Sequence, residues 1–136
     1  MKDRLKYVLA ISGSAAMLGI GRVLTPNPRG IGTHEQLGLP PCMFLKLTGI
    51  PCPSCGLTTS VAYAAHLQFS ASFVTQPFGL LIALIAFVSI PVAFVLLVSP
   101  SNWALRIPDR SSTLATYVLI AAYGLAWIFK ISHMHS

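Results

Sequence analysis

The sequence predicts an all-α membrane protein with three transmembrane helices and one short interfacial or re-entrant helix after a cysteine-containing turn. Of its 136 residues, 54% are hydrophobic and only 9% are charged, whereas soluble domains carry about 25% charged residues. The mean hydropathy is +0.73. Long apolar segments also flank a stretch rich in cysteine and proline. We therefore expect a single integral membrane domain over residues 1–136, with its core formed between helices.

The net charge of +6 is scattered over the expected termini and loops and is not gathered on one face. Basic loops beside an anionic membrane surface account for this charge, so nucleic acid is not an expected partner. The expected partner is the lipid bilayer. Other membrane proteins or a second copy are further candidates, because small residues on the first and last spans permit close helix packing.

The first expected span covers residues 6–24, after the basic sequence MKDRLK. With its flanks it reaches the roughly 20 residues that cross a bilayer. A cleaved signal peptide is the alternative. Because Gly19 to Arg22 offers no small-x-small cleavage site, we expect the helix to be retained.

The cysteine turn and the short helix are expected within residues 40–73. The helical part, residues 57–73, carries several polar side chains that would be costly in lipid, so we expect a shallow, re-entrant or protein-covered helix. The remaining spans are predicted at residues 78–98 and 113–130, joined by a loop over residues 99–112. Pro77 suits a first helical turn, Pro91 predicts a kink, and Lys130 marks where the chain leaves the membrane.

The distribution of basic residues predicts the topology. Placing the N-terminus in the cytoplasm gives five basic residues inside and four outside, in line with the positive-inside tendency. A fourth span over residues 57–73 would reverse this difference. We therefore expect a multi-pass protein of the bacterial inner membrane, with the cysteine turn on the outer face.

All three cysteines, Cys42, Cys52 and Cys55, lie in the stretch from Pro40 to Ser60. The segment from Cys52 to Cys55 is a C-P-x-C sequence at an expected loop-to-helix boundary. With Pro53 in the first helical position, Cys52 would cap the helix and Cys55 would lie in its first turn. The helix dipole there would favour a thiolate.

Three interpretations of this stretch remain open. In the first, the turn is structural and the protein is an accessory or interaction protein without a cofactor. In the second, the cysteines cycle between thiols and a disulfide. In the third, Cys42, Cys52 and Cys55 bind a zinc-type metal, with His34 as the fourth ligand. Haem attachment is excluded because position 56 is Gly and not His.

The sequence contains no hydrolase or phosphate-binding motif, so an enzyme is not expected. By helical spacing, His66 falls on the same face as Cys55 and Thr59 and is a candidate helper residue. Its simpler role is a hydrogen bond to the backbone.

The motif resembles the small bacterial membrane proteins of domain of unknown function 2752. The resemblance runs over about residues 38–81 and rests on two sequences, the LTGIPCPSCGLTT motif and the QPFG at the start of the next helix. It implies a bacterial membrane setting but no activity. Members commonly carry Arg where this chain has Thr59, and Asn where it has Gln76. The motif residues by position are Cys42, Cys52, Pro53, Cys55, Gly56 and Thr58, with Thr59 at the departing position.

Overall fold

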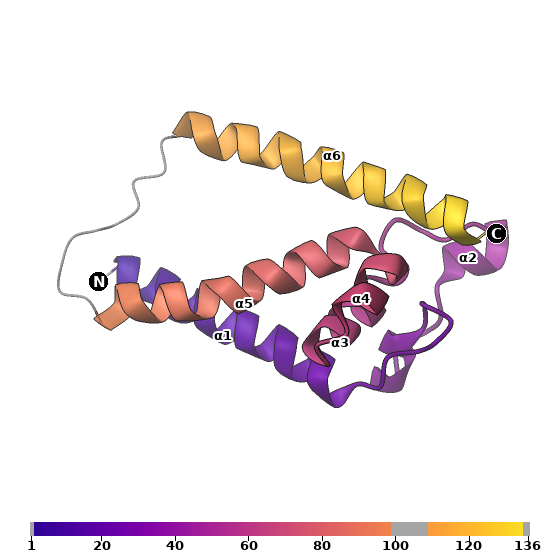
Figure 1. The fold of residues 1–136 in the computed structure, drawn as a ribbon, viewed down its shortest axis with the longest axis horizontal. Helices are drawn as coiled ribbons and strands as arrows, with labels where there is room; N and C mark the ends of the chain where they lie inside the picture. Colours follow the sequence, from indigo (N-terminus) through magenta and orange to yellow (C-terminus); the bar gives the residue numbers. More distant parts are fainter. Residues whose placement is uncertain (1, 99–108, 135–136) are drawn as a thin grey trace.

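The computed structural model describes residues 2–98 and 109–134 (Figure 1). All regular structure in these ranges is helical, without a strand, so the predicted all-α class is confirmed. The helices are α1 (Lys2–Val23), the short 3-10 helix η1 (Thr33–Leu37), α2 (Met43–Thr48), α3 (Leu57–Ala65), α4 (Phe69–Thr75), α5 (Pro77–Val98) and α6 (Asp109–Met134).

Helices α1 and α5 lie side by side and form the most extensive helix contact of the molecule. Helix α3 packs against both of them at one end of the pair, and α4 covers α3 and the start of α5. Helix α6 runs along the other side of α5 and makes only a few contacts with it (Figure 1). The described bundle is therefore packed most densely at the end that carries α3 and α4.

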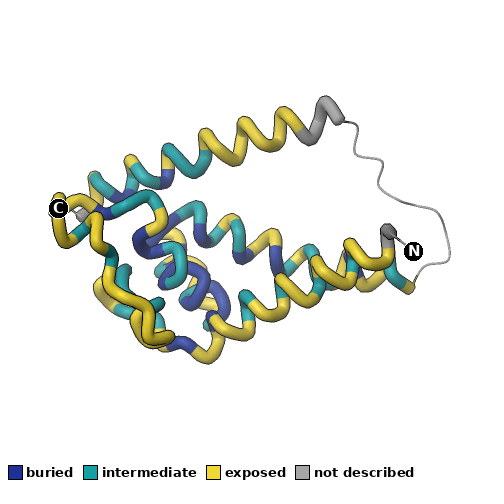
Figure 2. The backbone as a smooth tube through the Cα atoms, turned by 180° about the vertical axis from the view of Figure 1, so that it is seen from behind, coloured by how far each residue is buried: buried dark blue, intermediate teal, exposed yellow. Residues whose placement is uncertain are grey.

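Small side chains form the core at that end. The alanines Ala62, Ala64 and Ala83 are fully buried, and buried residues concentrate around α3, α4 and the first half of α5 (Figure 2). The Ser60 hydroxyl lies 2.8 Å from the Ser72 hydroxyl and also reaches the Gln76 carbonyl. These hydrogen bonds satisfy polar groups that lack access to water, so α3 and α4 pack without unpaired hydroxyls.

Two described helices are long and apolar enough to cross a membrane, not the three that we predicted. They are Pro77–Val98 and Thr113–His133, with mean hydropathies of 3.0 and 1.7. The segment predicted at residues 6–24 does form a helix, but Lys6 and Arg22 and several Ser and Gly residues lower its hydropathy. The loop predicted at residues 99–112 lies mostly outside the described residues, and α6 already begins at Asp109.

The prediction of a single short helix over residues 57–73 is wrong, because the chain forms two helices there, α3 and α4, with a break between them. Leu67 adopts a left-handed backbone conformation with φ of 62°. The backbone N–H of Gln68 donates to the Tyr63 carbonyl, and that of Leu67 donates to the Ala64 carbonyl. These two bonds form the Schellman motif that ends a helix. Six of the nine residues of α3 are buried, so protein covers this part of the polar segment, whereas residues 67–70 are exposed.

Close contact between α3 and α5 depends on Gly79. A Cβ atom at this position would lie 2.6 Å from the Ser60 Cβ, so the two helix backbones would have to separate. We expect Gly79→Ala to destabilise the protein by about 1–3 kcal/mol, as overpacking does. Gly13→Ala is the matched control, because a Cβ there meets nothing within 4 Å. Thermal unfolding of the detergent-purified variants measures the difference, and equal stability of both would contradict this packing.

Candidate metal and thiol site

The C-P-x-C sequence forms a β-turn that precedes α3. The Cys55 amide donates to the Cys52 carbonyl at 2.9 Å, and Pro53 occupies the second position, which suits its fixed φ. Helix α3 begins only at Leu57, after Gly56. Our prediction that Cys52 caps the helix and Cys55 lies in its first turn is therefore wrong. The reason is the left-handed conformation of Gly56, with φ of 87°, which interrupts the helical path.

Gly56 also allows a close approach between two loops. A Cβ atom on this residue would lie 2.6 Å from the Gly30 carbonyl oxygen and 3.0 Å from the Lys130 ammonium. Any other residue would both strain the backbone and push these groups apart. The cysteine turn is therefore held between the Gly30 loop and the Lys130 side chain, which keeps the thiols of Cys52 and Cys55 in defined positions.

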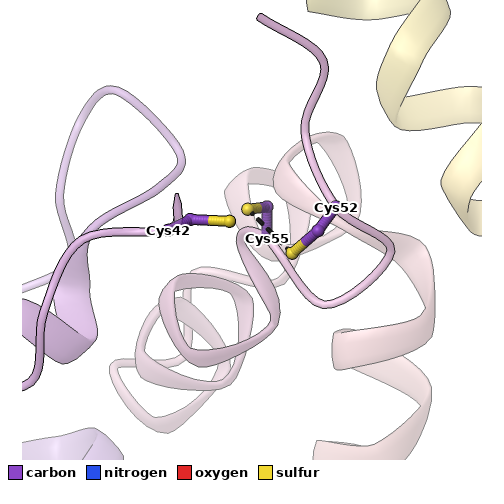
Figure 3. Close-up of side chains that lie close together, drawn as sticks. All are labelled: Cys42, Cys52 and Cys55. Atoms are coloured by element: carbon purple, nitrogen blue, oxygen red, sulfur yellow. Dashed lines mark hydrogen bonds between the residues drawn. The ribbon is translucent and has the colours of Figure 1, made fainter. Parts of the chain in front are cut away.

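The third thiol comes from a different segment. Cys42 directly precedes α2, and its sulfur lies with those of Cys52 and Cys55 in a group whose Sγ atoms are all within 4.8 Å of one another. The Cys52 thiol donates to the Cys55 sulfur at 3.1 Å, and Cys42 points toward the pair from the opposite side (Figure 3). Cys55 is buried, whereas Cys42 and Cys52 are partly exposed. We call these three residues the thiol cluster.

The surroundings make the thiols chemically unequal. The backbone N–H of Leu45, in the first turn of α2, stabilises a Cys42 thiolate, and together with the Cys55 thiol it lowers the pKa of Cys42 to about 7. Burial raises the pKa of Cys55 to about 12, and the neighbouring thiols add to this rise. Near neutral pH the Cys42 thiol is therefore partly ionised, whereas the Cys55 thiol stays protonated.

A small pocket of about 80 Å³ opens beside the cluster. Cys42 and Cys55 line it together with His34 and Glu35. His34 is therefore close to the thiols, as the metal interpretation requires, but it is not part of the thiol cluster. Its Nε2 atom instead lies 3.3 Å from the Pro40 carbonyl oxygen.

Three further candidate residues lie away from the sulfurs. The Thr59 hydroxyl is buried against that of Thr33 at 2.8 Å and ties α3 to η1. Thr58 lines an apolar pocket between α1, α3 and α5. His66 ends α3, where its Nδ1 accepts from the Arg22 guanidinium and its Nε2 donates to the Leu24 carbonyl. The histidine therefore joins α3 to the end of α1, as the simpler interpretation expected, and does not assist the thiols.

Helix α6 supplies contacts that the sequence analysis missed. The Tyr123 hydroxyl lies 3.0 Å from that of Ser54, and the Trp127 indole donates to the Pro51 carbonyl at 2.9 Å. One turn further, the Lys130 ammonium donates to the carbonyls of Gly30 and Thr75. Positions 123, 127 and 130 are four and three residues apart, so their side chains share one face of a helix. This spacing could have indicated from the sequence that the three side chains contact the same region.

Lys130 is only 6% exposed, although we predicted only that it marks the end of the last span. Its ammonium would lie 3.0 Å from a Cβ atom on Gly56, so it brings a positive charge to the end of the cysteine turn. Gln76 is also fully buried, and its amide nitrogen donates to the Pro53 carbonyl at 2.8 Å. Its Oε1 atom has no hydrogen-bond partner among the described residues. Gln76 thus fixes the cysteine turn from the α5 side.

Fold and site together define a small helical protein with a three-thiol cluster at the packed end of its bundle. Residues 42–90 match the family described as "Protein of unknown function (DUF2752)", so the predicted resemblance is confirmed over this segment. The match includes all three cysteines and Gln76 but not α6. No curated protein and no solved structure matches the chain.

The unequal thiols predict a pH-dependent labelling pattern. Because the pKa of Cys42 is lowered to about 7, its alkylation rate should rise with pH and reach half of its maximum near pH 7. Cys55, whose pKa is raised to about 12, should stay unlabelled up to at least about pH 9. Mass spectrometry of peptides after brief iodoacetamide treatment measures both rates. Faster labelling of Cys55 than of Cys42 would contradict the geometry.

Loss of the Lys130 ammonium should destabilise the protein. Lys130→Met leaves the buried carbonyls of Gly30 and Thr75 without this donor, which should cost about 1–3 kcal/mol. Lys46→Met removes a positive charge from an exposed position and is the matched control, with an expected change within about 0.5 kcal/mol. Thermal unfolding in detergent compares the two. Equal effects would mean that the buried contacts contribute nothing.

Proposed function

We propose that this chain is an integral membrane protein that binds a thiophilic metal ion of the zinc type through Cys42, Cys52 and Cys55. The observation that carries the proposal is the meeting of three sulfurs from two chain segments within 4.8 Å. Zinc prefers cysteine thiolate and histidine nitrogen ligands. This is the metal alternative of the sequence analysis. We favour it over an accessory protein with a purely structural turn.

The membrane part of the proposal rests on the exposure of the apolar helices. Only 17% of the apolar window in α5 and 11% of that in α6 is buried inside the protein. Most of the apolar surface of both helices is exposed, including the large side chains of Val88, Val95 and Ile128. Soluble monomers rarely expose apolar patches larger than a few hundred Å². A bilayer would cover these surfaces.

The spacing of the sulfurs suits a metal with modest adjustment. Zinc–sulfur bonds of about 2.3 Å in a tetrahedral site separate the sulfurs by about 3.8 Å. The sulfurs of Cys52 and Cys55 lie 3.1 Å apart and would have to move apart by about 0.7 Å, whereas any pair near the 4.8 Å limit would have to approach by about 1 Å. His34, on the adjoining pocket, is the available fourth ligand after a side-chain rotation.

Charge balance also supports metal binding. Three thiolates and one divalent ion leave a net charge of −1, which is costly to bury unless a cation is close. Lys130 supplies that cation, because its ammonium lies beside Gly56, the residue that follows Cys55. Cysteines that merely fill a core are buried and inert, whereas Cys42 and Cys52 are partly exposed. Their exposure would let an ion enter.

We assign the thiol cluster to the outer face of the bacterial inner membrane. Helix α1 begins at the opposite end of the bundle from the cluster, near the basic residues Arg4 and Lys6 (Figure 1). The positive-inside tendency puts that end in the cytoplasm.

A second candidate function is thiol–disulfide exchange by Cys52 and Cys55, favoured by their 3.1 Å contact. In this reaction a thiolate attacks the disulfide of a partner, the second thiol releases the partner, and the two electrons and two protons pass to it. The cysteine pair would be oxidised and the partner disulfide reduced to two thiols. The two candidates make different predictions for the resting state.

The test is the metal content and thiol state of the full-length protein, purified in detergent with and without added Zn²⁺. We expect one ion per chain. Each of Cys42→Ser, Cys52→Ser and Cys55→Ser should weaken metal binding more than about 100-fold, which exceeds the loss of about 10–100-fold seen when a group that only hydrogen-bonds a metal ligand is removed. Ser54→Ala is the matched control within the same turn. It removes the contact with Tyr123 but no thiol, and should keep the ion.

Three free thiols without metal in the wild-type protein would refute the proposal. A protein that takes up no ion, and whose mass is about 2 Da lower until it is reduced, would support disulfide chemistry instead. Equal zinc content in the wild type and in all three serine variants would show that the ion binds elsewhere.

A further inference from the structure

Helix α2 is not packed into the protein. None of its residues is buried, and it makes no extensive contact with another helix. The side chains of Met43, Phe44 and Leu47 are 69%, 47% and 79% exposed. Exposed apolar residues also flank the helix on both sides, and these are Leu37, Leu39 and Ile50.

A helix of this length needs external support. It has six residues, whereas isolated helices shorter than about 12–15 residues are marginal in water. Contacts hold the chain at both ends of the helix: Cys42 joins the thiol cluster, and the Pro51 carbonyl accepts from Trp127 of α6. The exposed apolar side chains between these two points therefore require a cover that residues 2–98 and 109–134 do not provide.

The position of α2 points to the bilayer as this cover. Helix α5 begins and α6 ends at the same end of the bundle, and α2 lies there beside the end of α6 (Figure 1). The apolar segment thus continues the apolar surface of the two long helices at the level where they would leave the lipid. Lys46 is the one charged residue between positions 36 and 56, and its positive charge complements anionic headgroups.

We propose that α2 is an interfacial anchor that inserts Met43, Phe44 and Leu47 into the headgroup region of the same membrane. This inference rests on the proposal that α5 and α6 cross the bilayer. Short segments with apolar side chains and a basic residue bind the interface in this way. Because Cys42 directly precedes α2, the membrane surface would then hold this cysteine beside Cys52 and Cys55.

The test is fluorescence quenching in vesicles of phosphatidylcholine and phosphatidylglycerol that contain the full-length protein. The lipids carry bromines either on the upper acyl carbons or near the chain ends. Phe44→Trp adds a reporter to α2, and Leu47→Trp repeats the measurement if the first variant does not fold. Arg29→Trp is the water-exposed control, and Val88→Trp reports on the exposed face of α5. The emission of each added tryptophan, taken as the variant's emission minus that of the wild type, is compared between the variants.

We expect the upper bromines to quench the tryptophan of Phe44→Trp at least about twofold more than that of Arg29→Trp, with blue-shifted emission. Emission and acrylamide quenching equal to those of Arg29→Trp would overturn the inference. Blue-shifted emission without bromine quenching would also overturn it, because a protein surface, such as a second copy, would then cover α2. If Val88→Trp escapes the deep bromines, the membrane proposal itself fails. If only Val88→Trp is quenched, that proposal stands and the anchor alone is refuted.

Discussion

The buried ammonium of Lys130 is the interaction on which the packed end of the molecule depends. It donates to the carbonyls of Gly30 and Thr75, and it lies beside Gly56 at the end of the cysteine turn. Four segments distant in the sequence meet there: the loop before η1, the cysteine turn, the junction of α4 and α5, and α6. Because α6 makes few contacts with α5, this polar junction, with Tyr123 and Trp127, holds the last helix in place.

The same junction explains why a thiol cluster can exist at this position. A turn of alternating proline and cysteine has little regular structure of its own, so its geometry has to come from its neighbours. Gln76 fixes it from α5, Tyr123 and Trp127 fix it from α6, and Gly56 lets the Gly30 loop approach. The positive charge of Lys130 then lies beside Gly56, next in the chain to Cys55, whose sulfur carries negative charge when it binds a metal. Rigidity and charge compensation thus come from the same residues.

The sequence was sufficient for the features that depend on local patterns. Apolar runs located α5 and most of α6, Pro77 marked the start of α5, and the resemblance to the family identified the segment that contains the cysteines. The division of residues 57–73 into α3 and α4 could not be predicted, because it depends on a left-handed Leu67, a conformation that leucine rarely adopts. Composition also did not reveal the burial of Lys130, since a lysine near the end of an apolar segment is usually at the membrane surface. Nor did the spacing of Cys42 from Cys52 indicate that their sulfurs meet, because loop geometry decides that distance.

The central claim is that three cysteines from two segments act together as ligands of one ion. X-ray absorption spectroscopy of the zinc-loaded, full-length protein tests it most directly, because it counts the atoms bound to the metal. We predict three sulfur neighbours at about 2.3 Å, together with one nitrogen or oxygen neighbour at about 2.0–2.1 Å. A first shell of only nitrogen and oxygen atoms would contradict the claim, since the ion would then bind to groups other than Cys42, Cys52 and Cys55.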